Sequence, residues 1–313
     1  MGRVREGLKK IIKMKRYILA VLVGVFFLTN IQAQQIASYS QYMHDHYLIN
    51  PAAAGATDYM PITLGYKKVW TGFKGSPEFY SLSGNTKIND NMGVGAKVFN
   101  YKSGYENKFG IDLSYAYSIK IGDANRLAFG LSASLYQFSL DKTQITLENP
   151  DDNTVTYATD KLIVPDANFG TYFTGKKYYV GISIAQLFGR KVNMMNTDYL
   201  EQRQVRHYYL HGGYKFEIND DYSIEPSLLM KFVEAGEFQA EINVKGTFKN
   251  IAWAGVSYRL NDAVIPMFGI QMEKFIFGYA YDITLSDIKG YSQGSHELMF
   301  IYKLGSIKSA ASL

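Results

Sequence analysis

The sequence has 313 residues, no cysteine, 26 tyrosines, 19 phenylalanines and a formal net charge of +5. Its length is that of one or two soluble domains or of one larger β-barrel. The lack of cysteine excludes disulfide bonds, a thiolate zinc site and a lipid anchor on an N-terminal cysteine.

Residues 1–33 have the three parts of an export signal. Seven lysines and arginines lie within residues 1–16, an apolar run of 12 residues extends from Tyr17 to Leu28, and the small Ala33 precedes two glutamines. The run is shorter than the about 20 residues that a membrane helix needs. We therefore predict a signal peptide that is cleaved after Ala33, with Met1 or Met14 as the start.

Removal of this signal changes the charge balance of the chain. The remaining residues include 26 basic and 27 acidic side chains, a net charge of −1. The positive excess therefore belongs to the export signal, and charge gives no reason to expect nucleic-acid binding.

Residues 34–61 precede the first predicted strand and include the stretch YSQYMHDHYLINPAAAG, residues 39–55. Pro51 and Pro61 would interrupt a central strand. We therefore predict an irregular segment ahead of the barrel, which lies either in the periplasm or tucked into the lumen.

The same stretch raises the question of a metal site. His44 and His46 flank Asp45, but no further ligands follow at a metal-binding spacing. His207 and His211 lie four residues apart on a predicted strand, which separates them by roughly 13 Å, too far for both to bind one ion. A packed segment is therefore favoured, and no metal site is predicted.

Residues 62–304 alternate between apolar and small or polar residues, which is the period of β-strands. Runs of about ten residues or more, with many aromatic residues near their ends, are typical of membrane strands. Open sheet edges cannot face lipid, so these strands should close into a barrel. We predict 14 strands, at residues 62–71, 77–89, 92–102, 105–119, 126–139, 166–175, 178–188, 205–218, 222–234, 238–248, 251–260, 264–273, 275–285 and 294–304.

The connections alternate in length. Those after even-numbered strands are short, and the long ones, 140–165, 189–204 and 286–293, follow odd-numbered strands. Outer-membrane barrels have short periplasmic turns and longer extracellular loops. The predicted fold is therefore an all-β, transmembrane antiparallel outer-membrane β-barrel of about 14 strands after a cleaved signal peptide, with a C-terminal tail at 305–313.

The alternation also assigns faces to individual residues. Leu113 and Leu131 should face lipid, where arginine should cost about 2–4 kcal/mol near the bilayer midplane. Ser114 and Ser132 should face the polar lumen, where arginine should be tolerated better.

No motif in the sequence points to catalysis. Ser295, His296 and Glu297 are adjacent, but neighbouring residues of a strand point to opposite faces and cannot form a relay. The sequence contains neither a G-x-S-x-G motif nor a P-loop, so no enzymatic activity and no cofactor are predicted. Glycines in MGVGAK, residues 92–97, favour close approach of another backbone, and the acidic NPDDNT, residues 149–154, is interpreted as a solvated loop tip.

Three stretches resemble one known family. They are SQYMHDHYLINPAAAG (40–55), KKVWTGFKGSPEFYSLSG (67–84) and GSHELMFIYKL (294–304). Together they are similar to the type IX secretion system membrane proteins of the PorP/SprF family, from Bacteroidota, over almost the whole mature chain. Two departures stand out: His44 and Asp45 replace the family's Asn-Pro after Gln-Tyr-Met, so a tight turn should be lost there, and the chain continues past its last strand with GSIKSAASL.

The resemblance implies a non-enzymatic outer-membrane component of type IX secretion and gliding motility. It implies binding of a secreted surface protein, such as the C-terminal domain of an adhesin, and contact with periplasmic secretion components, within outer-membrane lipid. Trp70 and Phe73, in the first extracellular loop, and Asp151 and Asp152, at a loop tip, are the candidate partner-binding residues.

A porin or small-ligand transporter is the alternative function, because it would share the barrel. A wide, water-filled lumen would favour this alternative, and 14 strands can enclose an open or a plugged lumen. The sequence leaves open which of the two exists, which secreted protein is bound, and whether the chain is a core secretion component or an adhesin-specific relative.

Overall fold

The computed structural model describes residues 39–141, 159–190, 192, 204–234, 236 and 238–306. The predicted signal peptide, residues 1–33, and the end of the tail, residues 307–313, lie outside the described residues. Among the residues described, no helix is both long enough and apolar enough to cross a membrane.

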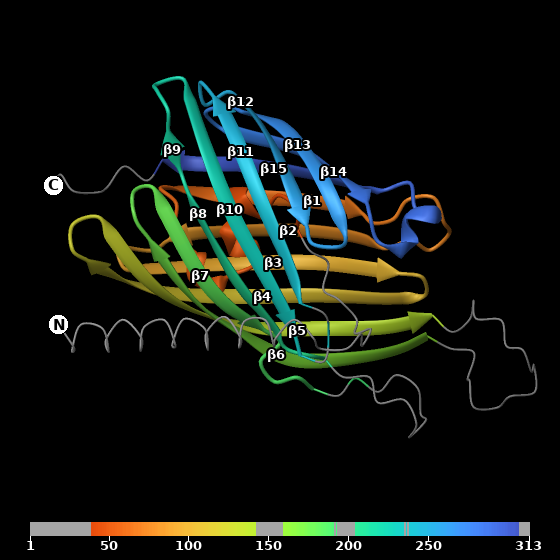
Figure 1. Ribbon diagram of the computed structural model, residues 1–313. Helices are drawn as coiled ribbons and strands as arrows, with labels where there is room; N and C mark the ends of the chain where they lie inside the picture. Colours follow the sequence, from red (N-terminus) through yellow and green to blue (C-terminus); the bar gives the residue numbers. More distant parts are fainter. Residues whose placement is uncertain are drawn as a thin grey trace, which may run out of the picture. The chain divides into compact units, whose positions relative to one another are not determined.

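The described chain forms one antiparallel sheet, in which each strand pairs with the next along the chain except that β8 and β9 both pair with β10 (Figure 1). The strands are β1 (Tyr59–Lys68), β2 (Glu78–Lys87), β3 (Met92–Ser103), β4 (Glu106–Ile121), β5 (Asn125–Asp141), β6 (Thr159–Thr174), β7 (Tyr178–Ala185), β8 (His207–Tyr214), β9 (Phe216–Glu217), β10 (Tyr222–Val233), β11 (Gln239–Phe248), β12 (Ala252–Arg259), β13 (Ala263–Gln271), β14 (Phe275–Thr284) and β15 (Ser295–Ser306).

The sheet closes on itself, because the last strand, β15, pairs with both β14 and β1. β8 and β9 both pair with β10, so they are two pieces of one crossing, which the sequence predicted as the single strand 205–218. The sheet therefore makes 14 crossings, and the predicted barrel of 14 strands is confirmed. Closure removes the two free edges that an open sheet would turn toward hydrocarbon.

Two strand boundaries differ from the predictions at prolines. β1 already contains Pro61 and β6 contains Pro165, although both were read as lying outside strands. β2 begins to pair with β1 only at Ile62, and β7 pairs with β6 only from Phe169. Each proline therefore sits where its strand is paired on one side only, which is where a strand tolerates proline.

The connection predicted at 140–165 is shorter than expected. Asp141 pairs with Thr159, so both ends of the predicted loop belong to strands β5 and β6. Residues 142–158, which include the candidates Asp151 and Asp152, lie outside the described residues.

The connections define two ends of the barrel. The short-turn end carries the connections at 88–91, 122–124, 175–177, 218–221, 249–251 and 272–274. The long-loop end carries those at 69–77, 104–105, 142–158, 186–206, 234–238, 260–262 and 285–294. We predict that the short-turn end is periplasmic.

Cysteine labelling tests this orientation cleanly, because the chain contains no cysteine of its own. A cysteine at Lys289, in the connection after β14, should react with a membrane-impermeant maleimide on intact cells. A cysteine at Asn250, between β11 and β12, should react only after the outer membrane is opened. Labelling of the Asn250 variant alone on intact cells would reverse the orientation.

The two faces of the strands are as predicted. The side chains of Leu113 and Leu131 are 60% and 56% exposed on the outer face, whereas Ser114 and Ser132 are buried on the inner face. Leu131→Arg should lower the free energy of unfolding by about 2–4 kcal/mol, since it places a charge in hydrocarbon. Ile218→Arg, at the short-turn end, should cost at most about 1 kcal/mol. Urea unfolding in lipid vesicles measures the free energy of unfolding of both variants. Equal losses of stability would contradict the placement of Leu131 near the bilayer midplane and of Ile218 near its edge.

The structure leads us to revise the expectation that Ser114 and Ser132 tolerate arginine, because both side chains are buried. The Ser114 and Ser132 hydroxyls lie 2.7 Å apart, and the Tyr47 hydroxyl lies 2.9 Å from that of Ser114. The space inside these strands is filled by residues that precede β1, so an arginine here would overpack the barrel.

Candidate functional site

Residues 39–55, named here the luminal plug, fold into three short turns against the inner faces of the strands. The turns are the 3₁₀ helices η2 (Tyr42–His44), η3 (His46–Leu48) and η4 (Pro51–Ala53). Of the two places that the sequence left open for this segment, the structure has the luminal one.

Local sequence explains these turns. The carboxylate of Asp45 accepts a hydrogen bond from the Tyr47 N–H at 3.1 Å, and the Asn50 side chain accepts one from the Ala52 N–H at 3.0 Å. Both are caps of the kind that Asp and Asn favour, and Pro51 suits the first position of η4. The tight turn that we expected to be lost at His44 and Asp45 is therefore present.

The plug extends between the two ends of the barrel. Its first residues contact Lys67 and Glu297, near the long-loop end of β1 and β15. At the other end the Gly55 N–H donates to the Asn85 side chain at 2.9 Å, near the short-turn end of β2. The plug thus connects to the barrel wall along its whole length.

Strands on all sides of the lumen hold the plug. Its contacts in the wall include Thr63 (β1), Ser83 (β2), Lys97 (β3), Ser114 (β4), Thr171 (β6), Ser183 (β7), His211 (β8), Ser227 (β10), Trp253 (β12), Asp282 (β14) and Glu297 (β15). A segment contacted from so many directions fills the middle of the lumen.

Glycines in the wall make room for the plug backbone. A Cβ atom at Gly93 would overlap the carbonyl of Ala54, and one at Gly130 would overlap the backbone of Pro51 and Ala52. The inference that glycines in MGVGAK permit close backbone approach is therefore correct for Gly93, whereas Gly95 makes room for the Tyr47 side chain. Gly130 on β5 admits backbone in the same way as Gly93.

A buried network of charges, named here the charge latch, holds the first residues of the plug. The Ser40 and Gln41 N–H groups donate to the two carboxylate oxygens of Glu297, at 2.8 and 3.0 Å. The Ser40 hydroxyl accepts hydrogen bonds from Lys67 Nζ at 2.6 Å and Arg259 Nη2 at 3.1 Å. The contacts with Glu297 and Arg259 join residues more than 200 positions apart in the chain.

The members of the latch are also paired with one another. Lys67 Nζ lies 3.1 Å from Asp282 and 3.2 Å from Glu297. Arg259 lies 2.8 Å from Glu241 and 2.9 Å from Asp282. Two bases thus face three buried acids, and Arg259 also pairs with the partly exposed Asp262 at 3.2 Å. The N–H groups of the plug supply further donors to the carboxylates, which outnumber the bases.

The histidines of the plug pack against aromatic rings. The His46 ring lies 4.1 Å from the Tyr179 ring and 5.5 Å from the His211 ring, and the His44 ring lies 4.4 Å from that of Trp253. Burial, together with nearby positive charge, lowers the pKa of His44 and His46 well below 6.5. When the plug is unseated, His44 and His46 can take up protons that they do not bind in the seated plug. Seating of the plug therefore becomes less favourable as the pH falls below about 6.5.

The arrangement of these side chains does not support a metal-binding site. In the described part of the chain, no three His, Cys, Asp or Glu side chains are placed to hold one ion. Ser295 and Glu297 are buried on the inner face of β15, whereas the His296 side chain is on the other face, 2.7 Å from the Tyr279 hydroxyl. These three residues therefore do not form a relay.

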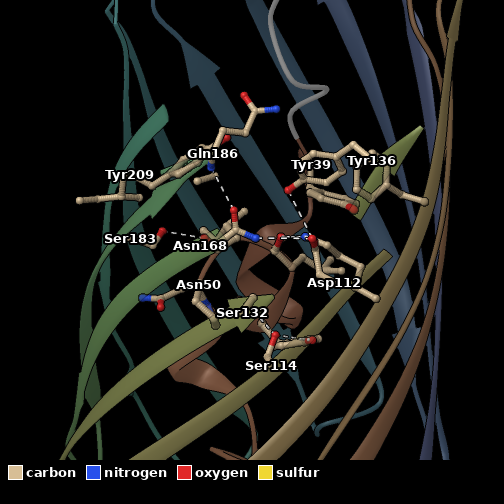
Figure 2. A pocket seen from close by; sticks show the side chains of 18 of the residues that line it. Tyr39, Asn50, Asp112, Ser114, Ser132, Tyr136, Asn168, Ser183, Gln186 and Tyr209 are labelled. Atoms are coloured by element: carbon tan, nitrogen blue, oxygen red, sulfur yellow. Dashed lines mark hydrogen bonds and ion pairs between the residues drawn. The ribbon is translucent and has the colours of Figure 1, made fainter. Parts of the chain in front are cut away.

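A small cavity of ≈ 70 Å³ remains between the plug and the wall. Figure 2 shows Asn50 of the plug below Asn168, Ser183 and Gln186, with Tyr39 and Asp112 on the other side. The cavity has room for a few water molecules, and pockets for small organic ligands measure about 300–1,000 Å³.

The candidate partner-binding residues are only partly placed by the structure. The Phe73 side chain is 38% exposed, in the connection between β1 and β2. Trp70 has a positive φ of 50°, and its N–H donates to the Ser295 hydroxyl at 3.0 Å, which ties this connection to the start of β15. Trp70 is thus held by the barrel, and Phe73 is the more accessible of the two.

Sequence reasoning missed the charge latch. Its members Lys67, Glu241, Arg259, Asp282 and Glu297 occupy inner-face positions, where the alternation places small or polar residues. Five charges at inner positions near one end were a signal of an ion network, but the pattern does not say which side chains meet.

Comparisons with known proteins now add to this geometry. Residues 31–302 match the family described as "Type IX secretion system membrane protein PorP/SprF". No curated protein matches the chain by sequence.

The structure is similar to solved outer-membrane barrels. The Ralstonia pickettii toluene transporter TbuX has a TM-score of 0.50 at 9% identity, with 82% of this chain and 93% of that chain covered. A Pseudomonas aeruginosa FadL homologue has a TM-score of 0.48 at 12% identity, with the same shares covered. The KdgM porin has a TM-score of 0.38 at 11% identity, covering 78% of this chain and 99% of that chain. At these identities the likeness concerns the fold alone.

Proposed function

Because the chain belongs to the PorP/SprF family of type IX secretion system membrane proteins, we propose that it binds a secreted surface protein at the outer membrane and helps to deliver or anchor it there. Membership makes the chain an outer-membrane component of type IX secretion, and its 14-stranded barrel fits that location. Binding of a secreted protein, and its delivery or anchoring by the barrel, are what we propose beyond family membership.

The seated plug is the observation that carries this proposal. The latch holds the plug at the long-loop end, and glycines of β3 and β5 accept its backbone nearer the short-turn end. A lumen filled in this way is poorly suited to diffusion of solutes. The part of the barrel that remains available to a partner on the cell surface is then its long-loop end, where Phe73 is exposed.

The partner is proposed to be the C-terminal domain of an adhesin-like protein, with periplasmic secretion components meeting the short-turn end. Phe73 and the connection at 142–158, with Asp151 and Asp152, are the first surfaces to test. Trp70 contributes by fixing the connection that presents Phe73.

Deletion of the gene tests this function. The surface proteome of the deletion strain should lack one or a few large exported proteins that the parent strain carries, and small-solute uptake should be unchanged. Complementation with the full chain is the control. An unchanged surface proteome together with lost uptake of a nutrient would favour the porin or small-ligand transporter instead.

A loop replacement then asks where the partner binds. Residues 143–157 should be exchanged for a short Gly/Ser linker, which keeps the paired ends Asp141 and Thr159 of β5 and β6. The barrel should still fold, and retention of the exported protein should fall. Normal retention in both this variant and Phe73→Ser would place the interface elsewhere.

A further inference from the structure

The outer face of the barrel has an apolar hollow of ≈ 470 Å³ over strands β14, β15, β1, β2, β3 and β4. Strand register places its lining in two rows. One row runs through Phe277, Phe300, Leu64, Leu82 and Val98, and the next, closer to the long-loop end, runs through Leu298, Tyr66, Tyr80, Asn100 and Phe109.

The hollow opens toward lipid. The side chains of Leu64, Leu82 and Leu298 are 49%, 47% and 41% exposed, and they lie on the same outer face as the other lipid-facing residues. In a barrel of the outer membrane, hydrocarbon is what surrounds this face. A hollow of this size with an apolar lining is suited to an acyl chain.

The next row toward the long-loop end is polar and contains three charged side chains. It runs through His296, Lys68, Glu78 and Lys102, which are paired in register on four neighbouring strands. Lys68 Nζ contacts the Glu78 carboxylate, which also accepts a hydrogen bond from the Tyr80 hydroxyl at 3.0 Å. Lys102 is exposed and makes no ion pair among the described residues.

From this juxtaposition we propose that the hollow and its charged rim form a binding site for a phosphorylated lipid of the membrane leaflet at the long-loop end. The acyl chain fills the hollow beside Leu64 and Leu82, and the phosphate lies against Lys102 and Lys68. A lysine near a membrane surface attracts an anionic lipid about fivefold per residue. This site is independent of the luminal plug and of the proposed protein partner.

Brominated lipids test the site through a tryptophan reporter. The full-length Leu82→Trp variant is placed in nanodiscs of phosphatidylcholine to which phosphatidic acid or phosphatidylcholine with brominated chains is added. Signals of the parent protein, which holds Trp70 and Trp253, are subtracted. Leu131→Trp, on the outer face of β5 away from the hollow, is the matched control.

The brominated phosphatidic acid should be favoured at Leu82→Trp over brominated phosphatidylcholine by at least about fivefold, and neither should be favoured at Leu131→Trp. Adding Lys68→Gln and Lys102→Gln should remove the preference. Lys161→Gln, an exposed lysine near the same end on β6, should leave it unchanged.

Equal quenching by the two lipids at both reporters would mean ordinary boundary lipid only and would overturn the proposal. A preference that survives loss of both rim lysines would overturn it as well. Absence of quenching by either lipid at Leu82→Trp would show that hydrocarbon chains do not enter the hollow, and it would also overturn the proposal.

Discussion

Arg259→Met should lower the free energy of unfolding of the barrel by about 3–5 kcal/mol, the cost of breaking a buried ion pair from one side. Arg259 is buried and contacts Glu241, Asp282 and the Ser40 hydroxyl. Its loss leaves Glu241, which is 2% exposed, without the guanidinium at 2.8 Å. Urea unfolding in lipid vesicles, followed by the fluorescence of Trp253 beside His44, measures the change.

The double variant Arg259→Met with Glu241→Met separates charge from packing. Replacement of both partners by apolar residues of similar volume removes the unpaired carboxylate. The double variant should therefore lose less free energy of unfolding than Arg259→Met alone. Glu234→Gln, which breaks a mostly exposed pair with Arg206, should change stability by at most about 1 kcal/mol. A double variant that is less stable than the single one would contradict an ionic role for the latch.

Gly130→Val should prevent the plug from seating and open the lumen to ions. The added side chain would occupy the place of the Pro51 and Ala52 backbone, which cannot move aside as a flexible side chain could. Overpacking of this kind costs about 3 kcal/mol or more, and release of the plug relieves it. Planar bilayers with the variant should conduct, whereas those with the parent protein should be silent.

Gly246→Val is the matched control for this experiment. It makes the same substitution in β11, where a Cβ atom would meet only the Ala254 carbonyl oxygen at 3.8 Å. It should therefore leave the bilayer silent. Protease cleavage within residues 39–55 of the Gly130 variant, but not of the control, would confirm that the plug has left its site. Conductance by the parent protein would show instead that the seated plug leaves a pore.

The strands could be predicted from the sequence because their pattern is local. The outer-face residues Leu113 and Leu131 lie next to the inner-face residues Ser114 and Ser132, and lipid on one side with a packed lumen on the other enforces this period of two. The same argument yields the number of crossings, since each is one alternating run between two turns. The predicted strand boundaries were wrong at Pro61 and Pro165, because whether a strand tolerates a proline depends on how the neighbouring strand pairs with it.

The place of the plug and the charge latch were decided by tertiary structure. Periodicity assigns no face to residues 39–55, which are irregular, and the caps of Asp45 and Asn50 shape their turns without saying where they lie. Glu297 binds Ser40 across 257 positions of the chain, a pairing that exists only because closure brings β15 beside β1. Local sequence determines which residues face inward; only closure of the barrel determines which inward residues meet, because buried charges find partners in space and not along the chain.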